Sequence, residues 1–274
     1  MNIYHPLKLG ILGCGAIGSR IALSTKKELK GLCRVSGVHD IHLEKAQDLA
    51  KKLKGMKLVK ETFPSLIMGS DLIVEATGAS DVRRLIGLAL QRKKHVLCMS
   101  VGKIIDPRQL VRLAKMNNCR LMIPSGAIGG IDAFKAASLV GVEEIVLTTK
   151  KSPNSLEQTD YLKNKKIFLS RIKKNTIIFE GNVEEAVKYF PKNINVAATL
   201  ALATQAKEKI KIVIMACPNL KNNIHEIKMS GEQGSILCRS ENRICPDNPK
   251  TSYLAVLSAI QTIKDFCTGC KVGT

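Results

Sequence analysis

The chain has no tryptophan, few other aromatic residues and a shortage of acidic side chains. It contains six Phe and four Tyr, and 23 Asp and Glu stand against 43 Lys and Arg scattered over 274 residues. Proteins that read nucleic acid interleave aromatic and basic side chains in grooves. The composition therefore argues against a specific nucleic-acid reader. The formal net charge of +20 indicates a basic surface that attracts anionic ligands, with only nonspecific nucleic-acid binding at low salt.

Long apolar runs are also missing. Hydrophobic residues make up 45% of the chain, but no run approaches the ~18 residues that a membrane span needs. The start, Met1-Asn-Ile-Tyr-His-Pro6, has neither the charged nor the apolar region of a signal peptide. We therefore expect a globular protein of the cytoplasm with no membrane partner.

A disulfide framework is absent too. The nine cysteines are odd in number and lack a framework spacing, which predicts reduced thiols. Cys267-Thr-Gly-Cys270 is the only CxxC motif, and no second pair completes a zinc site. We predict no metal site, and a chance or surface thiol pair is favoured over metal or redox chemistry.

A glycine-rich turn near the N-terminus carries the first functional signal. An apolar stretch, Lys8 to Leu12, leads into Gly13-Cys-Gly-Ala-Ile-Gly18 and then a helical pattern. In such a turn the glycines permit tight bending and close backbone approach, and the N-terminus of the helix faces a pyrophosphate. We expect cofactor contacts from this turn, specifically from Gly13, Gly15, Ala16, Ile17 and Gly18.

The second strand strengthens this interpretation. It runs from Arg34 to Asp40 and ends in an acid about twenty residues after the turn, where a dinucleotide site has its ribose partner. Asp40 would bond both ribose hydroxyls and repel a 2′-phosphate, which favours NAD. Because His42 and Lys45 lie close by, NADP is left open as a second cofactor.

Strands and helices alternate through the first half of the chain. The buried strand from Ser70 ends at Ala76, Thr77 and Gly78, a loop that should lie beside the cofactor because ligands bind at the carboxyl ends of parallel strands. This spacing predicts an α/β fold, a Rossmann domain with a doubly wound parallel sheet over residues 1–132.

The pattern changes after residue 132. Alternating segments at 145–150, 176–181, 210–215, 224–230 and 234–240, with short helices between them, predict an α+β catalytic and dimerisation domain over 133–245. A final helix, 252–266, follows the loop Pro246 to Thr251. We expect residues 246–274 to complete the first domain, with this C-terminal helix packed back on it.

Five segments together resemble the L-aspartate dehydrogenase family, nearly from end to end. They are Gly13-Cys-Gly-Ala-Ile-Gly18, Ser125-Gly-Ala-Ile-Gly-Gly-Ile-Asp132, Asn193-Ile-Asn-Val-Ala-Ala-Thr199, Pro218-Asn-Leu-Lys-Asn-Asn-Ile-His-Glu-Ile227 and Asn248-Pro-Lys-Thr-Ser252. The glycine fingerprint alone is shared by many unrelated enzymes, and the middle segments are far more specific. The lysine-rich segment 160–174 and the cysteine-bearing tail match no motif of the family.

The resemblance implies NAD(P)-dependent oxidation of L-aspartate to iminoaspartate, which feeds NAD biosynthesis or hydrolyses to oxaloacetate and ammonia. It implies that His225 is the catalytic histidine and that Ala127 and Asn195 contact the cofactor. It also suggests a homodimer and raises quinolinate synthase as a partner. Two alternatives stay open: a reductase resembling homoserine dehydrogenase or dihydrodipicolinate reductase, and a non-catalytic nucleotide-sensing protein.

The proposed chemistry sets requirements for the site. The substrate amine must be neutral before hydride transfer, which suits an imidazole that titrates near pH 7, and His225 is the best placed of the five histidines. The two carboxylates of aspartate need cationic or multi-donor anchors. The candidate substrate-binding residues are Ser125, Thr199, Lys250 and Thr251, the last two at an expected helix N-terminus.

Overall fold

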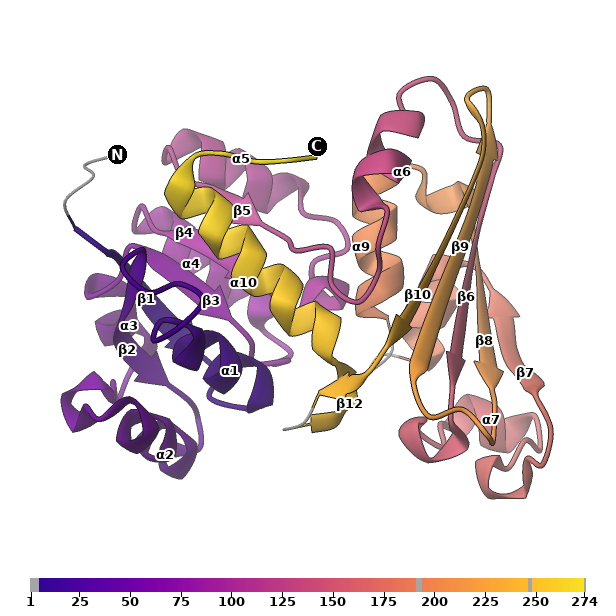
Figure 1. Ribbon diagram of the computed structural model, residues 1–274, viewed down its shortest axis with the longest axis horizontal. Helices are drawn as coiled ribbons and strands as arrows, with labels where there is room; N and C mark the ends of the chain where they lie inside the picture. Colours follow the sequence, from indigo (N-terminus) through magenta and orange to yellow (C-terminus); the bar gives the residue numbers. More distant parts are fainter. Residues whose placement is uncertain (1–4, 191–193, 246–247, 274) are drawn as a thin grey trace. The chain divides into compact units, whose positions relative to one another are not determined.

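The computed structural model describes residues 5–190, 194–245 and 248–273, which form two compact units (Figure 1). The first unit comprises residues up to Pro124 together with Val256–Lys271, and the second comprises Ser125–Ala255 and the last residues. The boundary therefore falls before the expected residue 132, because the loop after Pro124 bonds to a strand of the second unit. Residues 248–255, expected in the first domain, also group with the second unit.

The first unit is a five-stranded parallel sheet with crossover helices, in the order β2-β1-β3-β4-β5. Its elements are β1 (Leu7–Leu12), α1 (Ala16–Ser24), β2 (Cys33–His39), α2 (Leu43–Leu53), α3 (Phe63–Met68), β3 (Leu72–Glu75), α4 (Val82–Gln91), β4 (His95–Cys98), α5 (Arg108–Met116) and β5 (Leu121–Met122), with 3₁₀ turns η1 (Met56–Leu58) and η2 (Val101–Lys103). The Rossmann fold expected from the sequence is confirmed.

Continuous burial explains the central strands of this sheet. All four residues of β3 are buried, as helices on both faces of a parallel sheet require. The C-terminal helix α10 (Tyr253–Thr268) packs on this unit, as expected. Its Phe266 ring lies edge-on to His95 at 4.8 Å between centroids, and the Arg120 guanidinium lies over the same ring.

The second unit is a mixed five-stranded sheet in the order β10-β9-β6-β8-β7, which confirms the expected α+β lobe. Its elements are α6 (Ile131–Ala137), β6 (Glu144–Lys151), α7 (Asp160–Asn164), β7 (Thr176–Gly181), α8 (Val183–Tyr189), α9 (Asn195–Thr204), β8 (Ile210–Ala216), β9 (Asn223–Gly231), β10 (Gly234–Asn242), β11 (Ile244–Cys245) and β12 (Asn248–Ser252), with 3₁₀ turns η3 (Pro153–Ser155), η4 (Leu169–Arg171) and η5 (Lys207–Lys209). The segment expected to be a loop before the last helix thus contains β12, paired with β11.

Helices α6 and α9 lie on one face of this second sheet (Figure 1). Helix α9 is buried almost all round, including Ala197, Ala198 and Leu200, which is typical of a helix inside a core. Along β6 the residues on the covered face are all buried, beginning with Ile145 and Leu147 and ending with Thr149 and Lys151. The covered face is therefore apolar at one end and polar at the other. None of the described helices is long and apolar enough to cross a bilayer.

Candidate active site

The turn between β1 and α1 is shaped by close backbone packing. Gly13 has φ of +96°, and a Cβ at this position would lie 2.6 Å from the Ala76 carbonyl oxygen. A Cβ on Gly18 would collide with the Gly13 carbonyl oxygen, whereas one on Gly15 would meet no atom within 4 Å. Gly15, the residue before α1, has no side chain that could cap the first N–H groups of the helix. The turn fits a pyrophosphate.

Asp40 follows β2 directly and is tied to this turn. Its Oδ2 accepts a hydrogen bond from the Cys14 N–H at 2.7 Å, and its Oδ1 accepts one from the His42 N–H at 2.9 Å. The carboxylate is thus held at the sheet edge where the sequence places a ribose partner. Burial, and secondarily the charge of Asp40, raise the pKa of Cys14 to about 12, so this thiol stays protonated at neutral pH.

The loop after β3 is organised by Glu75, which is fully buried. Its Oε1 accepts hydrogen bonds from the Thr77 N–H and from the Ser100 hydroxyl, each at 2.8 Å. The Gly78 N–H in turn donates to Ser100 Oγ at 3.0 Å. These donors satisfy a carboxylate that burial would otherwise destabilise. Glu75 therefore shapes the loop of Ala76, Thr77 and Gly78 at the carboxyl edge of the sheet.

In the second unit, His225 lies at the polar end of the covered sheet face. It is 4% exposed, and its Nδ1 lies 3.1 Å from the Thr149 hydroxyl on the neighbouring strand. Burial, reinforced by the charge of Lys151, lowers the pKa of His225 to about 3. In the protein without substrate, the imidazole is therefore neutral at physiological pH and does not titrate near pH 7.

Lys151 is the cation of this cluster. It is the last residue of β6, two positions after Thr149 and so on the same face of the sheet, and it is 8% exposed. Burial lowers its pKa to about 8. A lysine with this pKa carries its charge at neutral pH and loses it in mild alkali. The cluster thus combines a neutral imidazole, a hydroxyl and a buried ammonium group.

The loop that contains Ala127 lies against the same cluster. The Ala127 carbonyl accepts a hydrogen bond from Asn242 Nδ2 at 2.7 Å, and the Gly129 N–H donates to Ser240 Oγ at 3.0 Å. Ser240 pairs with His225 across β10 and β9. The structure therefore brings Ala127 and His225 to the same region of one unit, although about a hundred residues separate them in the sequence.

The other expected residues of this unit are placed less directly. Thr199 is buried in α9, Asn195 is exposed at the start of that helix, and Ser125 is half-buried at the start of the loop. The backbone of Lys250 and Thr251 runs in β12, before α10, so neither residue stands at the helix N-terminus. Their side chains lie outside the part that the structure describes.

Two other histidines have structural partners in the first unit. His39 Nδ1 lies 2.7 Å from the Lys60 carbonyl oxygen. His95 Nδ1 accepts a hydrogen bond from the Arg120 N–H at 3.0 Å, while its ring packs on Phe266. Both imidazole rings are therefore held by structural contacts of the first unit.

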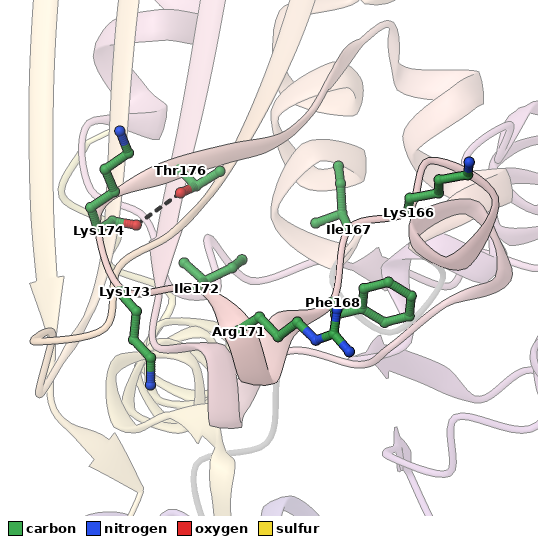
Figure 2. A pocket seen from close by; sticks show the side chains of 8 residues that line it. All are labelled: Lys166, Ile167, Phe168, Arg171, Ile172, Lys173, Lys174 and Thr176. Atoms are coloured by element: carbon green, nitrogen blue, oxygen red, sulfur yellow. Dashed lines mark hydrogen bonds between the residues drawn. The ribbon is translucent and has the colours of Figure 1, made fainter.

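A hollow of about 680 Å³ opens between α7 and β7, outside the His225 cluster (Figure 2). Its walls carry four cationic side chains, and the Arg171 guanidinium stacks over the exposed Phe168 ring. The lining residues are Lys166, Ile167, Phe168, Arg171, Ile172, Lys173, Lys174 and Thr176. With four cationic side chains among its lining residues, this hollow is part of the basic surface.

Comparisons with known proteins agree over both units. Residues 132–266 match the family described as aspartate dehydrogenase, C-terminal, and residues 13–124 match the homoserine dehydrogenase NAD-binding domain. The chain is 39% identical to an L-aspartate dehydrogenase of Methanosarcina barkeri and 41% identical to one of Methanocaldococcus jannaschii. Each alignment covers 98% of this chain and all of the relative.

The chain belongs to the L-aspartate dehydrogenase family.

Solved structures show the same fold. The aspartate dehydrogenase of Thermotoga maritima superposes with a TM-score of 0.71 at 26% identity, covering 98% of this chain and all of that one. A homoserine dehydrogenase of Thiobacillus denitrificans gives 0.64 at 15% identity, covering 96% and 73%, which shows the fold alone. Membership of the L-aspartate dehydrogenase family makes the chain an NAD(P)-dependent oxidoreductase.

Sequence reasoning missed Lys151 in this member of the L-aspartate dehydrogenase family. The residue is one of 43 basic side chains and follows another lysine, so nothing in the local pattern distinguishes it. The alternation along β6 was a usable signal, because Ile145, Leu147 and Thr149 predict that position 151 shares their face. A lysine on a buried face is rare enough to indicate a function.

Proposed function

We propose that this chain oxidises L-aspartate at the α carbon to iminoaspartate, with a nicotinamide dinucleotide as hydride acceptor. Family membership supports the reaction class and the substrate. The observation that carries the proposal is the pairing of a neutral, buried imidazole, His225, with the buried ammonium group of Lys151. This pair suits a substrate that has one amine and two carboxylates.

His225 is the proposed acid–base group. The ammonium group of aspartate must lose a proton before hydride leaves the α carbon, and His225 accepts this proton. In the absence of substrate its pKa is held near 3 by burial and by Lys151. Two incoming carboxylates reverse that field, because negative charge near an imidazole raises its pKa. The base therefore becomes effective when the correct dianion is bound.

Lys151 is the proposed anchor for one substrate carboxylate. Its ammonium group lies beside His225 in a region from which water is largely excluded, where a charge-assisted hydrogen bond is strong. Thr199, Ser125, Lys250 and Thr251 remain proposed substrate contacts on the basis of the sequence. The anchor orients the amine toward His225, and a carboxylate partner offsets the cost of burying the lysine charge.

The first unit is the proposed cofactor site. Gly13, Gly15, Ala16, Ile17 and Gly18 hold the pyrophosphate, and Asp40 bonds the ribose hydroxyls, which makes NAD the preferred form over NADP. The loop of Ala76, Thr77 and Gly78 completes the proposed cofactor contacts of this unit. Ala127 and Asn195, which belong to the second unit, remain proposed cofactor contacts on the basis of the family resemblance. When bound, the nicotinamide supplies the chemistry of hydride acceptance.

Assembly and cellular role are further parts of the proposal. Cys238 and Ser240 on β10 face the loop before α6, so Leu237, the neighbour of Cys238, lies on the opposite face of the sheet, where it is exposed. We propose that this opposite face pairs in a homodimer. Light scattering of the purified chain tests this point. A cytoplasmic role in NAD biosynthesis, with iminoaspartate passed to quinolinate synthase, follows from the family resemblance and is tested by copurification.

The reaction is tested by following NADH absorbance with the His225→Asn variant. We expect the parent to reduce NAD with L-aspartate but not with homoserine, and to oxidise NADH with oxaloacetate plus ammonium. His225→Asn should lower kcat by about 10²- to 10⁴-fold, with NADH binding by fluorescence unchanged. His5→Asn, at an exposed position, is the matched control. Full turnover by His225→Asn would refute the assignment, and turnover of homoserine alone would refute the substrate.

A further inference from the structure

Two cysteines from opposite ends of the chain meet in the first unit. Cys33 opens β2 and is buried, and Cys267 lies in the last turn of α10 and is half-buried. Their Sγ atoms are 3.3 Å apart although 234 residues separate them in the sequence. Every cysteine whose side chain the structure describes is a free thiol. The pair is therefore a reduced dithiol in direct contact.

Rigid packing holds both partners. Cys33 is anchored by β-pairing with Leu7 and by its N–H, which donates to the Leu29 carbonyl at 3.1 Å. Cys267 follows Phe266, whose ring packs against His95 and lies under the Arg120 guanidinium. A disulfide requires sulfurs ~2 Å apart, so the two atoms need to approach by only about 1 Å. This gap is within the range of small side-chain adjustments.

We propose that Cys33 and Cys267 form an oxidation site at which a peroxide converts the dithiol into a disulfide that fastens α10 to β2. The Cys267 thiolate attacks one peroxide oxygen, which gives a sulfenic acid and releases hydroxide. The Cys33 thiol then attacks the Cys267 sulfur, the S–S bond forms and water leaves. Overall, two thiols and one hydrogen peroxide give one disulfide and two waters.

The asymmetry of the pair supports this order of events. The hydrogen bond from Cys33 lowers the pKa of Cys267, whereas the same contact, with burial, raises the pKa of Cys33. Cys267 is also the more exposed of the two thiols, so it is the one that a small oxidant reaches. Among the described residues no group of three or more His, Cys, Asp or Glu side chains could hold a metal ion.

The position of the site predicts its effect. Cys33 and His95 are the first residues of β2 and β4, so the pair lies at the amino edge of the parallel sheet. Asp40 and the loop after β3 lie at the opposite, carboxyl edge. A disulfide at the amino edge should leave catalysis unchanged, and it should raise the melting temperature because it links distant parts of the chain. The chain-entropy effect of so long a loop corresponds to a rise on the order of 10 °C.

The test uses the full chain, reduced with dithiothreitol and then treated with hydrogen peroxide. We expect a mass loss of about 2 Da, a Cys33–Cys267 linked peptide, a higher melting temperature and reversal by dithiothreitol. The Cys270→Ser variant should behave like the parent. In Cys33→Ala and in Cys267→Ser, the oxidised and reduced samples should have the same melting temperature. Because each variant is compared with itself, any effect of the substitution on folding is the same in both samples.

Three results would overturn the proposal. They are a Cys267–Cys270 disulfide in the parent, stepwise oxygen addition at Cys267 without a crosslink, and an unchanged melting temperature despite a complete Cys33–Cys267 crosslink. Activity with aspartate is measured in parallel. The result for the Cys33–Cys267 disulfide and the result for the dehydrogenase activity are therefore obtained independently of each other.

Discussion

His225 Nδ1 lies 3.1 Å from Thr149 Oγ1, and the two residues are directly opposed across β9 and β6. A hydroxyl donates to or accepts from an imidazole nitrogen, so this contact holds the ring in one orientation whichever nitrogen carries the proton. The second nitrogen is then held in a fixed direction for the substrate amine. Thr149 is thus a positioning residue for the proposed acid–base group.

Removal of that hydroxyl should impair turnover more than binding. We expect Thr149→Val to lower kcat about fivefold, because one hydrogen bond worth ~1 kcal/mol no longer orients the ring. The KM for aspartate and for NAD should change less than twofold. Thr149→Ser keeps the hydroxyl and is the matched control. Equal kinetics for the valine and serine variants would show that the contact has no catalytic consequence.

Loss of the Lys151 charge should affect aspartate binding specifically. Lys151→Met should raise the KM for aspartate about 10- to 100-fold, the value of one charge-assisted hydrogen bond, with the KM for NAD unchanged. Lys151→Arg should retain part of the affinity. The neighbouring Lys150, which pairs with Glu226 at 2.9 Å, provides the control Lys150→Met. A rise of both KM values together would contradict an anchor role.

The pH dependence of the KM for aspartate tests the role of Lys151 independently. The pKa of Lys151 is lowered to about 8 by burial, so its charge is present below this pH and lost above it. The KM for aspartate should therefore rise as the pH passes about 8 in the parent enzyme. Lys151→Arg should not show this rise, because a guanidinium stays protonated. Initial rates between pH 6.5 and 9.5 distinguish the two profiles.

Cofactor preference should depend on the charge of Asp40. Asp40→Asn removes the carboxylate that would repel a 2′-phosphate but keeps an acceptor for the Cys14 N–H. We expect the KM for NAD to rise about tenfold and the KM for NADP to fall. Asp48 lies on the exposed side of α2, and Asp48→Asn is the control because it changes the net charge by the same amount. If the ratio of the KM for NAD to the KM for NADP were unchanged, Asp40 would not be the ribose ligand.

Burial of His225 should make the fold sensitive to acid. Its pKa is about 3 in the folded chain and ~6.5 when unfolded, so the unfolded state binds the extra proton between these values. Stability is therefore lost as the pH falls through this window, by roughly 3 kcal/mol between pH 6.5 and pH 4. Urea unfolding should show a shallower pH slope for His225→Asn than for the parent. Parallel slopes would mean that His225 is not buried as a neutral ring.

Local sequence was sufficient to predict the first half of the candidate site. The turn at Gly13 and Gly18 needs residues without a Cβ, and Asp40 follows its strand directly, so both signals lie within about 30 residues. The parallel sheet also followed from the alternation of strands and helices. By contrast, the strand β12 was missed, because its pairing with β11 is a contact that no periodicity encodes.

Tertiary structure alone brought Lys151 to His225 and Cys33 to Cys267. Alternation along a strand sets which residues share a face, but the register between β6 and β9 decides which of them become neighbours. That register depends on how both strands bury their apolar residues under α6 and α9, and α10 likewise reaches β2 only by packing on the first unit. Burial then lowered the pKa of His225, an effect of the folded environment that the residue type does not contain.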